Sequence, residues 1–232
     1  MFTRYEPSLL MLTVATGAVD GVSYLALDRV FTGNMTGNVL FIGFGLAGVA
    51  NLPVVNNLVA LLAFMLGAVL AARLTRGASD PVRLPRAGLA VLVCGTALTL
   101  LLAGLWLGTG APDEIRMVLI TGLLALVLGA QAAAVRQIGI RDLSTVVVTM
   151  SMVHLAADSR LAGGAGGAWW RRFGAIAAMG LGALVSAILT LRVSGAAALL
   201  LSGLVMAAGT AMIAVVRRRE ARTAVDSADP TS

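Results

Sequence analysis

The sequence predicts an all-α membrane protein with about six transmembrane helices and two re-entrant or broken intramembrane segments. Three observations predict it: the apolar composition, six long apolar stretches, and arginines gathered between and after them. Of the 232 residues, 59% are hydrophobic and only 12% are charged. A soluble domain keeps roughly a quarter of its residues charged. The apolar excess must therefore face lipid, and the bilayer is the first partner that we expect.

A helix needs about 20 apolar residues to cross about 30 Å of hydrocarbon. Six stretches reach this length: 8–27, 55–73, 87–109, 115–135, 172–191 and 195–216. Prolines lie just before four of them, where a missing N–H costs little: Pro7, Pro53, Pro85 and Pro112. We therefore expect six spanning helices.

Two further segments are apolar but do not match ordinary spans. Residues 30–48 are numerous enough to cross, yet they contain glycines and asparagines that are unusual in lipid. Residues 144–158 number about 15, short of the ~20 that a crossing needs. We expect both segments to lie within the membrane, with 144–158 entering and leaving on one side.

The arginines decide the topology. The net charge is +6 without any lysine, and arginines gather at 73–86, on both flanks of 144–158, and at 217–222. The positive-inside rule places such segments and the C-terminus in the cytoplasm, so nucleic acid is not the partner that they indicate. If 30–48 re-enters, the N-terminus is also cytoplasmic and there are six spans. If 30–48 crosses, there are seven spans and an external N-terminus; we favour six.

The six-span topology predicts an inverted repeat within one membrane domain, residues 1–232. Each half, 1–110 and 111–216, then has a span, an intramembrane segment and two spans, in opposite orientations. The tail, 217–232, is cytoplasmic. A weak sequence echo between the halves consists of two alignments: Thr36 with Thr149 and, after a two-residue gap, Asp20 with Gln131.

Asp20 is the sharpest polar feature of the spans. If the first helix begins near Ser8, Asp20 lies about 12 residues or roughly 18 Å along it, near the middle of the bilayer. A carboxylate at that depth is expensive unless it faces protein, water or a cation, so it indicates a functional site. The alternative is a helix that begins earlier and leaves Asp20 at the interface.

A second polar group follows in residues 31–38. Asn34 and Asn38 are four residues apart, and Thr36 lies between them, so on a helix the two amides share a face. Such a segment suits a broken helix, or a half-helix that begins near Thr36 and aims free N–H groups at the membrane centre. The alternative is a polar clamp between helices that binds no ligand.

The counterparts in the second half are Gln131, Thr149 and His154. His154 is the single histidine, and it lies in the short segment 144–158. A buried histidine commonly has a structural hydrogen-bonding role, and a proton-coupling role beside Asp20 is the alternative. We count all three among the candidate solute-binding residues.

The sequence contains no pattern of catalytic residues. It has no catalytic triad, no metal-ligand spacing and no phosphate-binding glycine loop, and Cys94 is its one cysteine. We therefore expect no enzyme activity, no metal and no cofactor.

Two runs of residues carry a family resemblance. The sequence DGVSYL begins at Asp20, and the sequence VFTGNMTGN covers 30–38. Together they resemble the YoaK-like family of bacterial membrane proteins, in which an Asp-initiated stretch leads to a Phe-x-x-Asn-x-Thr-Gly-Asn signature. The resemblance implies a site around Asp20, Asn34, Thr36 and Asn38. It implies no substrate, because the family has no assigned activity.

From these observations we expect a small transporter of the bacterial inner membrane that moves a small polar or anionic solute. Its site lies between the two halves, and Asp20 is the group that could couple transport to protons. A passive channel is the first alternative, since paired re-entrant half-helices also suit selective conduction. A non-transporting scaffold is the second, and a homo-oligomer is compatible with either.

Overall fold

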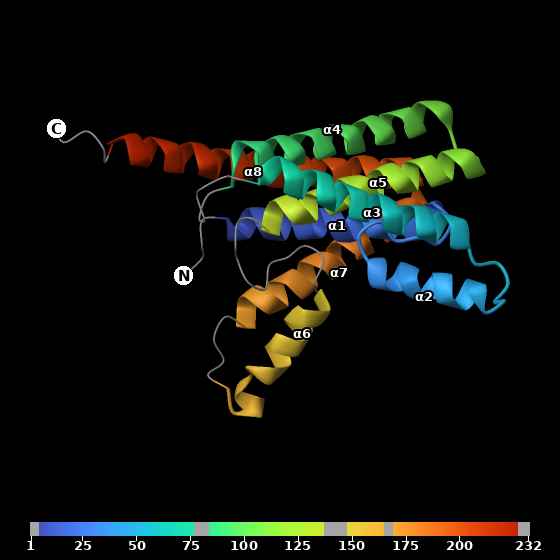
Figure 1. The fold of residues 1–232 in the computed structure, drawn as a ribbon, viewed down its shortest axis with the longest axis horizontal. Coiled ribbons are helices and arrows are strands. Elements are labelled where there is room, and N and C mark those ends of the chain that lie inside the picture. The colour runs from blue at the N-terminus through green and yellow to red at the C-terminus, as the bar shows by residue number, and fades with distance from the viewer. Residues whose placement is uncertain (1–4, 77–83, 137–147, 165–168, 227–232) are drawn as a thin grey trace.

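The computed structural model describes residues 5–76, 84–136, 148–164 and 169–226 (Figure 1). These residues form helices and connections, with no strand among them. The elements are α1 (Glu6–Ala26), α2 (Met35–Leu46), α3 (Val54–Thr75), α4 (Arg86–Thr109), α5 (Glu114–Arg136), α6 (Val148–Ala157), the short 3₁₀ helix η1 (Arg160–Ala162), α7 (Trp169–Arg192) and α8 (Gly195–Asp226). The all-α prediction is confirmed.

Six of these helices are long and apolar enough to cross a membrane: α1, α3, α4, α5, α7 and the Gly195–Ala221 part of α8. They correspond one to one with the six predicted stretches. Their surfaces carry large apolar side chains such as Leu66, Leu105 and Ile188, each more than half exposed. Side chains of this kind are stable on the outside only where lipid surrounds them, so the exposed faces of the bundle are its lipid-facing faces.

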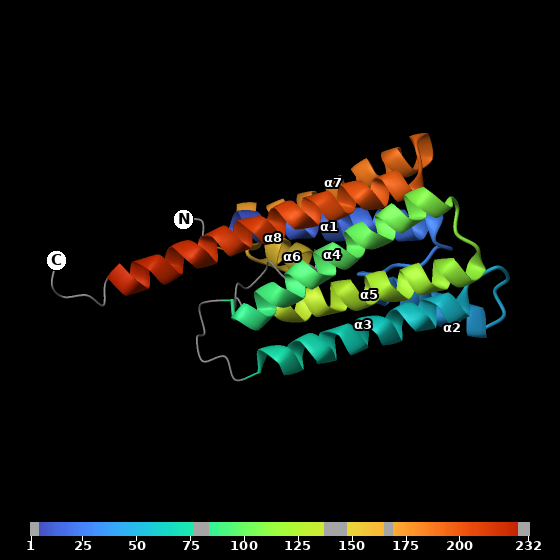
Figure 2. The ribbon, with the colours of Figure 1, turned by 90° about the horizontal axis from the view of Figure 1, so that it is seen from above.

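The bundle is organised around α1 and α5. Helix α1 packs against α7 and α8, α5 packs against α3 and α4, and α4 meets α8 (Figure 2). Of the α1 span, 61% is buried inside the protein, more than of the other five spans. Its side chains Leu9, Leu12 and Val19 belong to the main apolar core. Because α1 is the innermost helix, a polar residue on it can reach protein partners instead of lipid.

Glycines bring α1 and α7 into backbone contact. A Cβ atom added to Gly17 would overlap the carbonyl oxygen of Met179, and one added to Gly182 would overlap that of Val14. Such small residues let membrane helices pack closely. The contact is reciprocal, because each helix supplies one glycine and one carbonyl.

The same arrangement joins α3 and α5. A Cβ atom on Gly129 would overlap the carbonyl oxygen of Phe64, and one on Gly67 would overlap that of Leu126. The two tight pairs, α1 with α7 and α3 with α5, therefore share one mode of packing.

Helix α2 is a re-entrant element. After α1 the chain turns at Asp28 and Arg29, which have left-handed φ angles of 69° and 56°, and runs back along the bundle before α2 begins. Helix α2 has 12 residues, roughly 18 Å of rise, too few to cross. Figure 1 shows α2 leading back to the end of the bundle where α1 ends and α3 begins. The described residues therefore contain six helices long enough to cross, and the seven-span alternative requires a crossing that α2 is too short to make.

Helix α6 is the short element of the second half. It has 10 residues, roughly 15 Å of rise, which agrees with the expectation that 144–158 is too short to cross. It packs on α7 and η1. Residues 144–147 and Arg141 lie outside the described residues, so the relative placement of Arg141 and Arg160 is not part of the structure.

Candidate functional site

Asp20 faces the protein interior. Its exposed fraction is 4%, although it belongs to a helix long enough to span the membrane. It precedes Ala26, the last residue of α1, by about 9 Å of helix rise. Asp20 therefore lies nearer the end of its helix than the sequence placed it, because the helix begins two residues before Ser8 and ends at Ala26. It remains buried there because the returning chain covers it.

The carboxylate of Asp20 holds this returning chain. Its Oδ1 accepts hydrogen bonds from the backbone N–H of Thr32 at 2.9 Å, from the backbone N–H of Gly33 at 2.6 Å and from the hydroxyl of Thr32 at 3.2 Å. Thr32 and Gly33 come just before α2, where backbone N–H groups have no helical partner. We call Asp20, Thr32 and Gly33 the carboxylate clasp.

The second carboxylate oxygen of Asp20, Oδ2, has no hydrogen-bond partner in the structure and is buried. A Cβ atom placed on Gly33 would lie 3.2 Å from this oxygen, 3.0 Å from Cγ2 of Thr16 and 3.3 Å from Cδ1 of Leu128. The absence of a side chain on Gly33 therefore lets the backbone approach the carboxylate, and methyl groups line the space around it.

Asn38 supports the clasp from α2. Its Oδ1 accepts from the backbone N–H of Phe31 at 3.0 Å, and its Nδ2 donates to the carbonyl oxygen of Phe31 at 2.6 Å. The side chain of Asn38 is fully buried. Both ends of its amide are therefore occupied by the backbone of Phe31, within the segment that leads into α2.

Asn34 and Thr36 are exposed and do not turn toward Asp20. Helix α2 begins at Met35, so Asn34 precedes the helix and the argument that four-residue spacing places it beside Asn38 does not apply. The donors expected from Asn34, Thr36 and Asn38 side chains are replaced by Thr32 and Gly33. The sequence indicated this kind of donor, because it predicted a broken helix or half-helix with free backbone N–H groups in residues 31–38, but it did not assign these groups to Thr32 and Gly33.

An aromatic cluster adjoins the clasp. The rings of Tyr24, Phe31 and Phe41 are stacked. Their centroids are 5.0 Å apart for Tyr24 and Phe31, 6.3 Å for Tyr24 and Phe41, and 6.2 Å for Phe31 and Phe41. Tyr24 lies one helical turn after Asp20, and Phe31 immediately precedes Thr32. The stacked rings fix the returning chain against α1 through apolar contact.

Of the three candidate residues of the second half, Gln131 comes close to this site and the other two do not. Its Nε2 donates to Oγ1 of Thr16 at 3.1 Å, and Thr16 lies one turn before Asp20 on α1. Thr149 is exposed and His154 is half-buried on α6, which packs on α7 and η1 and makes no contact with α1 or α5. The structure therefore brings Gln131 to the Asp20 region but not Thr149 or His154.

A second polar cluster, missed by the sequence reasoning, lies at the other end of α1. Glu6 is fully buried, and its Oε1 is 2.8 Å from Nη2 of Arg171. This contact is an ion pair without hydrogen-bond alignment, since neither Glu6 oxygen has a hydrogen-bond partner of good geometry. The hydroxyl of Tyr5 donates to Oε2 of Glu220 at 2.7 Å, and burial and this carboxylate together raise the pKa of Tyr5. Arg171 therefore joins the start of α7 to the start of α1 through an ion pair.

Six apolar spans with a re-entrant helix held by a buried carboxylate define a multi-pass integral membrane protein. Residues 8–212 match the family described as protein of unknown function (DUF1275), and the chain belongs to this family. The chain is 30% identical over 156 residues to the UPF0700 transmembrane protein YoaK of Bacillus subtilis (strain 168), which covers 66% of this chain and 67% of that protein. No solved structure matches. The YoaK-like resemblance of residues 20–38 is thereby confirmed.

Proposed function

We propose that the protein is a small transporter that moves a small polar or anionic solute past the carboxylate clasp, with proton coupling through Asp20. The observation that carries the proposal is the burial of this carboxylate on a helix long enough to span the membrane. The carboxylate accepts hydrogen bonds from Thr32 and Gly33, the residues that lead into the re-entrant helix α2. Ionisable groups at such positions are characteristic of substrate and ion pathways. The nearby Gln131 adds a polar group from the second half.

The proposal includes an inverted repeat of 1–110 and 111–216. The order span, short helix, span, span is the same in both halves, with α1 matched to α5, α2 to α6, α3 to α7 and α4 to α8. The contacts support this matching, because α1 packs on α7 and α8 as α5 packs on α3 and α4. Transporters built from inverted repeats hold their substrates at the interface between the repeats.

The reciprocal glycine contacts give the repeat a register. Gly17 on α1 corresponds to Gly129 on α5, and Val14 corresponds to Leu126 with the same offset. With the same offset, Asp20 corresponds to Ala132. The sequence alignment of the two halves paired Asp20 with Gln131, so the two alignments differ by one residue. The second half thus has no carboxylate at the matched position, which makes Asp20 a single coupling group.

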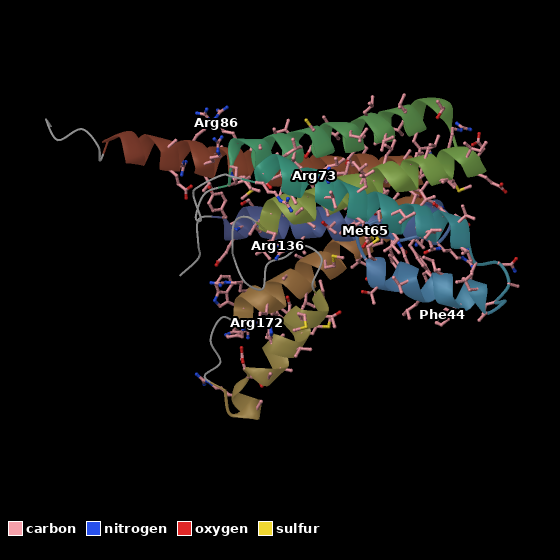
Figure 3. All side chains as sticks on the ribbon, viewed as in Figure 1. Phe44, Met65, Arg73, Arg86, Arg136 and Arg172 are labelled. Carbon is pink, nitrogen blue, oxygen red and sulfur yellow. The ribbon has the colours of Figure 1, made fainter. Side chains whose placement is uncertain are left out.

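The proposal also places the C-terminus in the cytoplasm. Figure 3 shows Arg73, Arg86, Arg136 and Arg172 toward the same end of the bundle, the end to which α8 carries the C-terminus. A membrane protein retains such arginine-rich ends on the cytoplasmic side. The carboxylate clasp, near the opposite end of α1, then lies toward the outer side.

The test is solute flux in proteoliposomes. A thermal-shift screen against small polar and anionic metabolites identifies a ligand, because binding to the folded state raises its stability. A transporter then shows saturable flux of that ligand that Asp20→Asn abolishes and Asp28→Asn, at an exposed turn, leaves unchanged. Flux that never saturates and ignores Asp20 indicates a passive pore, the second candidate, which the re-entrant α2 favours. No flux with any bound ligand indicates a scaffold.

A further inference from the structure

The carboxylate clasp has the chemistry of an anion-binding site that the protein itself fills. Three donors converge on one oxygen: the N–H groups of Thr32 and Gly33 and the hydroxyl of Thr32. They stand immediately before α2, a 12-residue helix whose N-terminus favours negative charge. The Asp20 carboxylate that they bind is 96% buried, since 4% is exposed, and its Oδ2 has no partner.

We propose that this cluster of donors is the binding site for the carboxylate or similar small oxyanion group of the solute, and that Asp20 occupies it when the solute is absent. The inference rests on the proposed transport function and names the solute class for the same site. A carboxylate side chain already satisfies these donors, so a carboxylate of a solute is a chemical match for them. Because Gly33 has no side chain, a carboxylate can approach its backbone closely, as Asp20 does.

The site holds one negative charge at a time. The groups that interact with Asp20 are the backbone N–H groups of Thr32, Gly33 and Asn34 and the hydroxyl of Thr32. Two carboxylates sharing these donors would repel each other strongly in a buried setting. Solute entry therefore requires that Asp20 take up a proton and leave the donors, so each anion is accompanied by one proton.

No described cationic side chain contacts the clasp to change this balance. Apart from Tyr24, one turn after Asp20, the described titratable residues on the surrounding elements lie toward helix ends and in turns: Tyr5, Glu6, Asp28 and Arg29 around α1, Arg73 and Arg76 at the end of α3, Glu114, Arg116 and Arg136 on α5, Arg171, Arg172 and Arg192 on α7, and Arg217, Arg218, Arg219 and Glu220 on α8. The positive end of α2 and the polar hydrogens of Thr32 and Gly33 are therefore the groups that attract the anion.

Chemical rescue tests the site without any transport measurement. Asp20→Ala empties the clasp and leaves its donors unpaired, so sodium acetate should stabilise the variant against heat in a saturable way, relative to sodium chloride at equal ionic strength. Acetate should bind this variant roughly tenfold or more tightly than the wild type, in which the tethered carboxylate competes. Asp28→Asn, which removes an exposed carboxylate charge and tolerates the left-handed backbone at this position, is the matched control and should behave as the wild type.

The outcomes are distinct. If acetate fails to stabilise folded Asp20→Ala, or stabilises Asp28→Asn and the wild type as strongly as it stabilises Asp20→Ala, the anion site is wrong. If Asp20→Ala does not accumulate as folded protein, Asp20→Ser, which keeps a small acceptor, replaces it and is judged by the same criterion. Acetate rescue without any solute flux would retain the anion site and refute the transport function.

Discussion

At the scale of single residues, two side chains supply partners for backbone that no helix satisfies. Asp20 binds the N–H groups of Thr32 and Gly33, and Asn38 binds both backbone groups of Phe31. Non-helical backbone at membrane depth persists only where protein satisfies it. The sequence revealed Asp20 and Asn38, because their polarity stands out against an apolar background. It could not reveal that Asn38 is fully occupied by backbone, since this depends on where α2 begins.

Asn38→Leu should therefore destabilise the fold. The substitution leaves the N–H and C=O of Phe31 without partners, and each unsatisfied buried group costs about 1–3 kcal/mol. We expect the free energy of unfolding in detergent, measured by denaturant titration, to fall by at least about 2 kcal/mol. Asn34→Leu in the same motif is the matched control, since that side chain is exposed. Equal losses in the two variants would show that the Phe31 contacts are unimportant.

The buried Glu6–Arg171 pair makes a second prediction at this scale. Arg171→Met leaves a carboxylate that is fully buried without its cation, and breaking a buried pair in this way costs about 3–5 kcal/mol. Adding Glu6→Gln to Arg171→Met should restore much of the lost stability, because the uncompensated charge is then gone. Thermal unfolding of the wild type, both single variants and the double variant measures the coupling, and strictly additive losses would contradict it.

At the scale of elements, hydropathy predicted the six spans because crossing length is set by the bilayer. It could not decide whether 30–48 crosses, since that stretch is apolar and long. The decision comes from the turn at Asp28 and Arg29, whose left-handed backbone returns the chain along α1, and from the late start of α2 at Met35. Neither feature has a hydropathy signal.

The close crossing of α1 and α7 can be tested by two glycines on the same helix. A Cβ atom on Gly182 would overlap the carbonyl oxygen of Val14, whereas one on Gly180 has no heavy atom within 4 Å. Gly182→Ala should lower the free energy of unfolding by about 1–3 kcal/mol through overpacking. Gly180→Ala should be neutral or stabilise by up to about 1 kcal/mol, since alanine favours helix. The reverse order, measured by unfolding in detergent, would refute this packing.

At the scale of the whole molecule, the arginine distribution and the even number of spans act together. In the proposed topology six spans place both termini on one side, and the positive-inside rule assigns the cytoplasm to that side from the arginines at the ends of α3, α5 and α7. The sequence makes this prediction because the rule depends on composition alone. The sequence did not predict that α1 packs on α7 and α3 packs on α5. These pairs are held by contacts between glycines and carbonyl groups that lie far apart in the chain.

Cysteine labelling tests this topology directly. In a Cys94→Ala background, Asp28→Cys and Asn51→Cys flank the re-entrant segment and α2, and both should react with a membrane-impermeant maleimide added outside intact cells. Arg76→Cys, in the turn that ends α3, should react only after the membrane is permeabilised. The reason is length: α2 is too short to cross, so the chain before and after it must lie on one side. Labelling of positions 28 and 51 from opposite sides would establish a seventh crossing. The carboxylate clasp would then lack the re-entrant helix on which both its geometry and the proposed anion site depend.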